Sequence, residues 1–245
     1  MNTQPKSKSW RQDRDHLLHP YTDFSTFKTE GSQVISSASG MHVTDDQGRE
    51  FLDGIAGLWC VNIGHGRRDM AEAIANQVMQ MQYYNPFGHS TNEPASELGA
   101  WLADNAPGDL NHVYYTCGGS TANDAAVRLV HYYNTMRGKH LKKKIISRLK
   151  AYHGVTIAAA SITGVPANHT AFDLPLDGFL HTDQPHLYRF GEDGETKEDF
   201  ATRCADNLDK LIVTEGPDTV AAFFAEPVMG AGGVIVPPET YFEKI

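Results

Sequence analysis

Residues 112–129 read HVYYTCGGSTANDAAVRL and join an apolar run to a helix-forming segment through two glycines. The apolar run predicts a strand over 112–116, and the segment after the glycines predicts a helix over 122–137. A turn between two such elements directs several backbone N–H groups, and the positive end of the helix dipole, at one point. The turn Cys117–Thr121 is therefore a candidate phosphate site, and it is equally well explained as a plain glycine turn capped by Ser120.

Strands and helices continue to alternate beyond this turn. Apolar runs predict further strands at 144–149, 179–182 and 220–225, and helical spacing predicts a helix over 198–214. Short strands that alternate with helices are typical of an α/β domain with a mostly parallel sheet. Ligands of such sheets lie beyond the carboxyl ends of the strands, so the loops that follow the strands are the candidate site.

The first part of the chain shows a different sequence pattern. Residues 1–30 are polar with scattered aromatics, which indicates an arm with a short helix. Residues 33–53 alternate around turn-forming positions and predict a small antiparallel meander. Apolar residues at helical spacing predict a helix over 68–82, and a second helix opens at Pro94.

Bulk properties exclude several classes of protein. A chain of 245 residues with 40% apolar content can bury a substantial core, and its formal net charge of -9 argues against a general nucleic-acid binder. Cys60, Cys117 and Cys204 are far apart, which suggests no disulfide framework and fits a reducing cytoplasm. We find no signal-peptide pattern and no run of 18 apolar residues, so we predict a cytoplasmic protein without a membrane partner.

Two further loops carry candidate chemistry. The loop Ala151–Gly154 holds Tyr152, which can stack on a planar ring, and His153, a candidate base; a packed tyrosine and a structural histidine are the plainer alternatives. Glu226 ends the last predicted strand, and the proline after it keeps it extended. Its carboxylate is expected on the ligand side of the sheet, with a surface position as the alternative.

Other readings of the sequence are weaker. The turn at 117–121 does not match G-x-G-x-x-G, lacks a Walker lysine and only nearly matches G-x-S-x-G, so a hydrolase that uses Ser120 is a minor alternative. The histidines do not show metal-ligand spacing, and we predict no metal site. Gly57–Gly66 and Tyr83–Ser90 are rich in aromatics and glycine, which fits either the apolar walls of a pocket or core packing under a loop.

Five segments, taken in order, resemble the motifs of the class III aminotransferases: GLWCVNIGHG, APGDLNHVYY, GGSTANDAAVRL, AYHG and AEPVMGAGGVIVPP. The resemblance is strongest to the branch that uses ω-amino acids, amines and diamines with pyruvate, and it runs from near Tyr21 to Ile245. It implies the α/β fold of fold-type-I pyridoxal-phosphate enzymes, a mostly parallel sheet with helices on both faces, incomplete here. It also implies an N-terminal arm and small-domain segment, 1–66, before the first part of the large cofactor-binding domain, 67–245.

The resemblance implies a role for each matched residue. Gly119 and Ser120 would contact the phosphate of pyridoxal phosphate. Tyr152 and His153 would lie at its ring, and Glu226 would lie near the polar edge of the ring. Tyr152 and Trp59 would form walls of the substrate pocket, and Phe87 would reach in from the neighbouring subunit of a homodimer.

The implied activity is a ping-pong transfer of an amino group from an ω-amino acid, amine or diamine to pyruvate or a similar oxo acid. Two features depart from the family pattern. Thr121 stands where the family usually has Glu, and Lys244 is the only lysine after Glu226, so the Schiff-base lysine is expected to be absent from this chain. We therefore expect the N-terminal portion of an aminotransferase, with a catalytically inactive cofactor-binding or dimerising fragment as the alternative.

Overall fold

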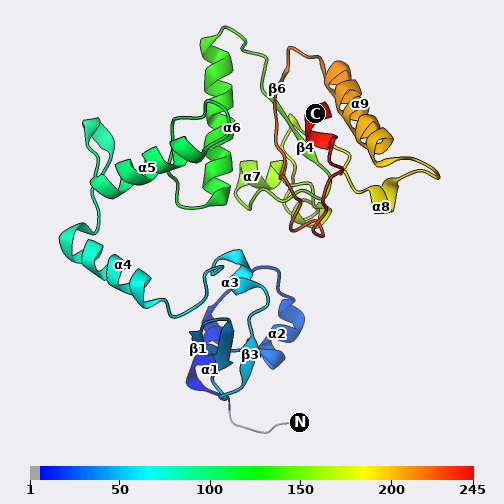
Figure 1. The fold of residues 1–245 in the computed structure, drawn as a ribbon. Helices are drawn as coiled ribbons and strands as arrows, with labels where there is room; N and C mark the ends of the chain where they lie inside the picture. The colour runs from blue at the N-terminus through cyan, green and yellow to red at the C-terminus, as the bar shows by residue number, and fades with distance from the viewer. Residues whose placement is uncertain (1–5) are drawn as a thin grey trace. The chain divides into compact units, whose positions relative to one another are not determined.

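The chain divides into two compact units, one that ends at Trp101 and one that spans Leu102–Ile245 (Figure 1). The computed structural model describes residues 6–245, so the start of the predicted arm lies outside the described residues. The division after residue 66 that the resemblance implies separates parts of the whole protein, and it stays a prediction. None of the helices within the described part of the chain combines the length and the apolar character that crossing a bilayer requires.

The first unit opens with two short helices and an antiparallel sheet. Helix α1 (Lys8–His16) begins after Ser7, whose hydroxyl accepts a hydrogen bond from the Trp10 N–H at 3.1 Å, and α2 (Phe24–Glu30) follows. The sheet has the order β1-β2-β3, with the strands β1 (Ile35–Ser39), β2 (His42–Asp45) and β3 (Glu50–Leu52). The predicted short helix and the predicted meander over 33–53 are confirmed.

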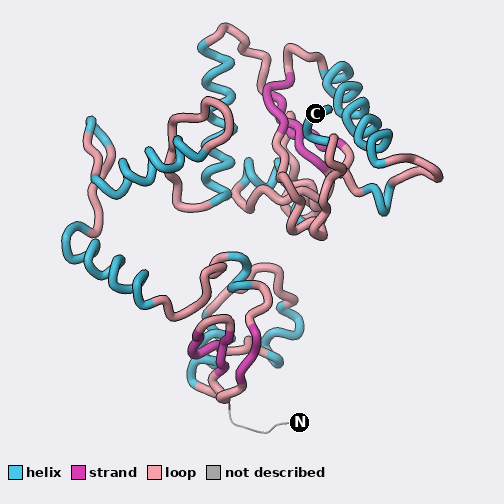
Figure 2. Tube along the Cα trace, viewed as in Figure 1, coloured by secondary structure: helices cyan, strands magenta, loops and turns pink. Residues whose placement is uncertain are grey.

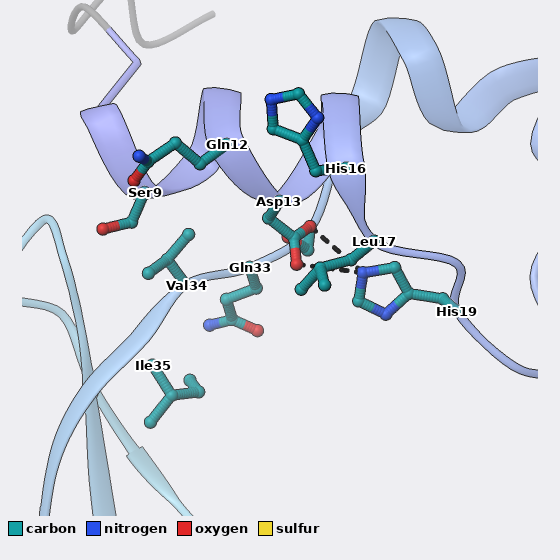
Figure 3. A pocket seen from close by; sticks show the side chains of 10 residues that line it. Ser9, Gln12, Asp13, His16, Leu17, His19, Gln33, Val34 and Ile35 are labelled. Atoms are coloured by element: carbon teal, nitrogen blue, oxygen red, sulfur yellow. Dashed lines mark hydrogen bonds and ion pairs between the residues drawn. The ribbon is translucent and has the colours of Figure 1, made fainter.

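A cavity of about 530 Å³ lies between α1 and the start of β1. Its polar lining includes the Asp13 carboxylate, which accepts a hydrogen bond from His19 Nε2 at 3.0 Å (Figure 3). The same carboxylate accepts a hydrogen bond from the Ser32 hydroxyl. Leu17 and Ile35 contribute apolar surface to the lining. None of the predicted site residues lines this cavity, so it is separate from the candidate site.

Helices make up most of the rest of the first unit. The elements after β3 are the short α3 (Ala56–Trp59), α4 (Arg68–Met81), the 3₁₀ turn η1 (Phe87–His89) and α5 (Glu93–Asn105), which runs across the boundary between the units. Both helices predicted from apolar spacing, one from residue 68 and one near Pro94, are therefore confirmed.

The second unit is built on a three-stranded parallel sheet with the order β5-β4-β6. Its strands are β4 (Lys144–Arg148), β5 (Phe179–Thr182) and β6 (Val220–Phe223). In the register, Ile145 pairs with Phe179 on one side and with Ala222 on the other. The three strands predicted after the glycine turn are confirmed, two of them slightly shorter than expected.

Helices cover both faces of this sheet (Figure 1). Ile145 packs against Val127 of α6 (Gly119–Met136) and Ile162 of α7 (Ile157–Ile162). The adjacent Ile146 points to the opposite face, because side chains alternate along a strand, and packs against Leu208 of α9 (Lys197–Glu215). The remaining short helices are η2 (Pro166–Asn168), α8 (Leu187–Phe190) and α10 (Tyr241–Lys244). The predicted α/β class is confirmed.

The strand predicted at 112–116 is wrong. The segment leads into α6 as a loop (Figure 2) and forms no ladder with another strand among the residues 6–245. Val113 is 38% exposed and Tyr114 is 72% exposed, so the apolar side chains are not covered as those of a central strand would be. A strand is defined by its hydrogen-bonded neighbour, and an apolar run alone does not supply one.

We expect Leu208→Ala to lower the free energy of unfolding by about 2–5 kcal/mol, because Leu208 is 5% exposed and its loss leaves a cavity between α9 and the sheet. Leu141→Ala is the matched control, since Leu141 is 78% exposed, and it should change that energy by less than about 0.5 kcal/mol. Urea unfolding followed by circular dichroism measures both, and equal midpoints for the two variants would contradict this packing.

Candidate active site

The N-terminus of α6 is open for an anion. Gly118 precedes the helix with an extended backbone, and no side chain among the described residues caps it. The first helical hydrogen bond runs from the Ala122 N–H to the Gly118 carbonyl at 3.0 Å, so the N–H groups of Gly119 and Ser120 lie before it. A Cβ at either Gly118 or Gly119 would meet nothing within 4 Å, which leaves the backbone accessible to a ligand.

Thr121 closes this turn on itself. Its hydroxyl donates a hydrogen bond to the Gly118 carbonyl at 2.7 Å and lies 3.5 Å from the Cys117 sulfur. The residue that departs from the family pattern is therefore bonded within its own turn, and it leaves the N–H groups of the helix end unblocked.

The loop after β4 is held against this helix end. The Val155 N–H donates to Ser120 Oγ at 3.1 Å, and Asn123 Nδ2 donates to the His153 carbonyl at 2.6 Å. Gly154 has a φ of +129°, and a Cβ there would collide with the Ser120 side chain. The loop that carries Tyr152 and the turn that offers the N–H groups thus form one assembly.

Asp124 extends the same contact by one turn. Its Oδ1 accepts from Thr156 Oγ1 at 2.8 Å and from the Ala159 N–H at 3.0 Å. The carboxylate lies at the first turn of α7, where exposed N–H groups and the helix dipole favour a negative charge. This bond fixes where the loop at 150–156 ends.

Glu226 ties the loop after β4 to the loop after β6. Its Oε1 accepts from the Tyr152 N–H at 3.0 Å, and its Oε2 accepts from the Gly230 N–H at 3.0 Å. Its carbonyl accepts from Arg148 Nη2. Both carboxylate oxygens are occupied by backbone donors, so this side chain orients the main chain on which Tyr152 sits.

Arg148 is a fully buried cation beneath these loops, with 0% of its surface exposed. Its Nε and Nη1 have no hydrogen-bond partner among the described residues, and its guanidinium lies over the rings of Tyr241 at 5.7 Å and Phe242 at 5.8 Å. Contacts with aromatic faces stabilise a cation that has little access to water. The positive charge of Arg148 contributes to lowering the pKa of the nearby His153.

His153 is neutral at pH 7. Burial, together with the nearby Arg148 and His181, lowers its pKa to about 4. Its ring lies edge-on to Phe224 with centroids 6.1 Å apart, and its Nε2 is buried without a partner among the residues described. At pH 7 the buried Nε2 of His153 therefore belongs to an uncharged imidazole ring.

Trp59 and Phe87 lie in the first unit, and both are exposed, at 62% and 80%. Trp59 ends α3, where four consecutive residues, Ala56 to Trp59, have positive φ values between 48° and 67°. This segment is a left-handed turn, and each non-glycine residue in it costs roughly 1–2 kcal/mol. The Phe87 N–H donates to Asn85 Oδ1 at 3.1 Å.

The structure brings five of the predicted site residues together in the second unit: Gly119, Ser120, Tyr152, His153 and Glu226. Asn123 and Asp124 were not predicted as site residues, although a polar pair in the first turns after a glycine turn is a signal for them. Arg148 was not predicted either, and its signal is a charge at the end of an apolar strand. The set joins a helix end with open N–H groups to the loop that carries Tyr152, and such groups are of the kinds that a phosphorylated planar ligand requires.

Comparison with known proteins gives a family. The sequence model of the class-III aminotransferases matches residues 26–245. The chain is 42% identical over 245 residues to putrescine–pyruvate aminotransferase of Pseudomonas aeruginosa, covering 99% of this chain and 53% of that protein. It is 48% identical over 230 residues to gamma-aminobutyrate transaminase 1 of Oryza sativa subsp. indica, covering 94% and 45%.

Among solved structures, the chain is similar to the omega transaminase of Pseudomonas jessenii in complex with PMP. The TM-score is 0.95 at 45% sequence identity, and the match covers 98% of this chain and 53% of that chain. This chain therefore spans about half the length of the relatives it matches. The likeness confirms the fold type I that the resemblance to the class III aminotransferases implies.

The neutral state of His153 makes stability depend on pH. Its folded pKa of about 4 lies below the ordinary value of 6.5, so the unfolded chain binds more protons between these values. We expect the free energy of unfolding to fall as the pH drops below 6.5 and this loss to level off below about 4.

Urea unfolding at pH 7.0, 5.5 and 4.5 measures the effect. The wild type should lose more stability over this range than His153→Asn, while His140→Asn, a change at an exposed histidine, should behave as the wild type. Identical losses for wild type and His153→Asn would show that the histidine does not titrate in this way.

Proposed function

The chain belongs to the class III aminotransferases, and from this premise we propose that the protein moves an amino group from an ω-amino acid, amine or diamine to pyruvate or a similar oxo acid. The cofactor of this family is pyridoxal phosphate. One observation carries the proposal: the N-terminus of α6, Tyr152 and Glu226 are hydrogen-bonded into one assembly. The relatives named for putrescine with pyruvate and for gamma-aminobutyrate support this choice of substrates.

The residues present fit the phosphate of this cofactor. We assign the phosphate to the N–H groups of Gly119 and Ser120, which precede the first helical hydrogen bond. The Ser120 hydroxyl accepts from Val155 and keeps its own proton, which it can donate to a phosphate oxygen. Pyridoxal phosphate, when bound, supplies the electron sink through which the amino group is exchanged.

We assign Tyr152 to the face of the pyridine ring, with His153 beside it as a neutral group. Glu226 supports the polar edge of the ring indirectly, because its two oxygens hold the main chain of Tyr152 and Gly230 in place. The negative charge of Glu226 stays paired with these donors, so its role is to orient and not to move a proton.

Trp59 and Phe87 are proposed as the apolar walls of the substrate pocket, Phe87 in the pocket of a neighbouring subunit. Both rings are exposed and thus accessible to a ligand or a partner, as this proposal requires. A variant of a similar thermostable omega transaminase with glycine in place of a tryptophan was engineered for the asymmetric synthesis of enantiopure bulky amines. That finding supports a tryptophan as a limit on substrate size.

We propose a homodimer in the cytoplasm as the working form of the protein. The role of Phe87 requires a second subunit. Cys60 and Cys117 are exposed free thiols, which supports a reducing compartment.

The Schiff-base lysine is proposed to lie outside residues 1–245. The support is that the chain spans about half the length of its relatives and that Lys244 alone follows Glu226. A chain without that lysine is proposed to bind the cofactor without turnover, which is the inactive alternative to the aminotransferase.

The ring assignment predicts the effect of two substitutions on cofactor affinity. Tyr152→Ala should weaken the binding of pyridoxal phosphate about five- to tenfold, since stacking contributes about 0.5–1.5 kcal/mol beyond burial. Tyr152→Phe keeps the ring and should bind within about twofold of the wild type. Absorbance titration of the cofactor-free protein measures both, and equal affinity of Tyr152→Ala and wild type would remove Tyr152 from the ring.

The lysine assignment predicts the outcome of chemical trapping. After incubation with pyridoxal phosphate and reduction with borohydride, peptide mass spectrometry should find no specifically modified lysine within residues 1–245. A stoichiometric label on any lysine of this stretch would overturn the assignment and identify the residue that holds the cofactor.

A further inference from the structure

The turn that carries Trp59 is one that the backbone resists. Ala56, Leu58 and Trp59 lie in the left-handed region with Gly57 between them, although only glycine adopts this conformation freely. The turn closes with hydrogen bonds from the Trp59 N–H to the Ile55 carbonyl at 2.7 Å and from the Cys60 N–H to the Ala56 carbonyl at 3.0 Å. A strained backbone persists only where its surroundings hold it.

Packing does not hold this turn. The Trp59 side chain is 62% exposed and Leu58 is 73% exposed, so little apolar surface is buried beneath them. The direction in which Trp59 points is therefore set by the backbone of the turn and by whatever fixes that backbone.

The carboxylate of Asp53 is the group that reaches the turn. Its Oδ2 accepts hydrogen bonds from the Gly57 N–H at 2.8 Å and from His65 Nε2 at 3.0 Å, and its side chain is only 10% exposed. The His65 hydrogen bond, together with the N–H groups of Gly57 and Ile55, holds the pKa of Asp53 below its usual value. The group is therefore charged at neutral pH, which strengthens both bonds.

His65 is in turn fixed to the sheet of the first unit. Its N–H donates to the Gly40 carbonyl at 2.8 Å, and its carbonyl accepts from the Gly40 N–H at 3.1 Å, at the corner between β1 and β2. A continuous series of hydrogen bonds runs from the sheet through His65 and Asp53 to the N–H of Gly57, in the middle of the strained turn.

We propose that Asp53 and His65 are positioning residues that hold the left-handed turn at 56–59 and thereby fix Trp59 for the discrimination of amine substrates by size. The proposal rests on the proposed function, which places Trp59 in the wall of the substrate pocket. Neither residue touches substrate, and both act through the backbone of Gly57.

Two measurements on the full protein test this proposal. The first is amide hydrogen exchange of the peptide that covers 53–65, which should be at least about tenfold faster in Asp53→Ala because local opening becomes easier. The second is the ratio of kcat/KM for a bulky aryl-alkyl amine to that for a linear diamine, with pyruvate as acceptor. This ratio should change by about fivefold or more.

Matched variants sharpen the test. Asp46→Ala, at an exposed aspartate of the same unit, should leave both readouts unchanged. Asp53→Asn and His65→Gln, which keep the size of the side chains, should give smaller changes in the same direction and carry the test if Asp53→Ala does not fold. Leu58→Gly relieves the strain within the turn, so in the Asp53→Ala background it should restore the exchange rate toward that of the wild type.

The outcomes are separable. Unchanged hydrogen exchange in Asp53→Ala overturns the positioning role whatever the enzyme does. Faster exchange with an unchanged substrate ratio shows that the turn is held but does not set selectivity, which overturns the proposal. A wild type that transaminates no amine overturns the proposed function, while the exchange measurement still decides whether Asp53 holds the turn.

Discussion

The two oxygens of the Glu226 carboxylate set the spacing between the loops in which the candidate site lies. One oxygen takes the Tyr152 N–H and the other takes the Gly230 N–H, so segments from the ends of β4 and β6 are fixed to one group. Backbone N–H groups that leave a sheet lose their ladder partners and need new acceptors. A charged acceptor binds them more strongly than a carbonyl does. The position of the Tyr152 main chain depends on this carboxylate, and removing the carboxylate would free two main-chain donors at once.

The close approach of these loops also depends on glycines, which have no side chain. Gly154 lies against Ser120, and Gly232 lies against the Lys150 carbonyl, so a Cβ at either glycine would collide with its neighbour. The first unit shows the opposite case, since the turn before Trp59 uses non-glycine residues where glycine would be easier and relies on Asp53 to hold them. The protein therefore forms tight backbone in two ways: glycines allow the close approach of the loops after β4 and β6, and hydrogen bonds hold the turn that carries Trp59.

The strands β4, β5 and β6 were predictable because each is a short apolar run bounded by turns, and the order of the motifs identified the family. The segment 112–116 was wrongly predicted to be a strand. Its composition is that of a strand, but no described strand pairs with it. Tyr152 and Glu226 were placed at the ends of strands by pattern alone, yet the bond between them joins residues far apart in the chain, which periodicity does not report. Asp124 and Arg148 were missed for the same reason, because their roles depend on partners that only the folded chain brings close.

The Ser120 hydroxyl has a consequence that reaches beyond its own contact. It accepts a hydrogen bond from the Val155 N–H, and its single proton remains available for a ligand at the end of α6. A ligand that accepts a hydrogen bond from this hydroxyl makes its oxygen more electron-rich and strengthens the hydrogen bond from the Val155 N–H. Occupancy of the helix end and order of the loop at 150–156 are then thermodynamically coupled, and the coupling is reciprocal. Under the proposed function, whatever stiffens this loop would raise the affinity for the phosphate, and the phosphate would in turn protect the loop from local opening.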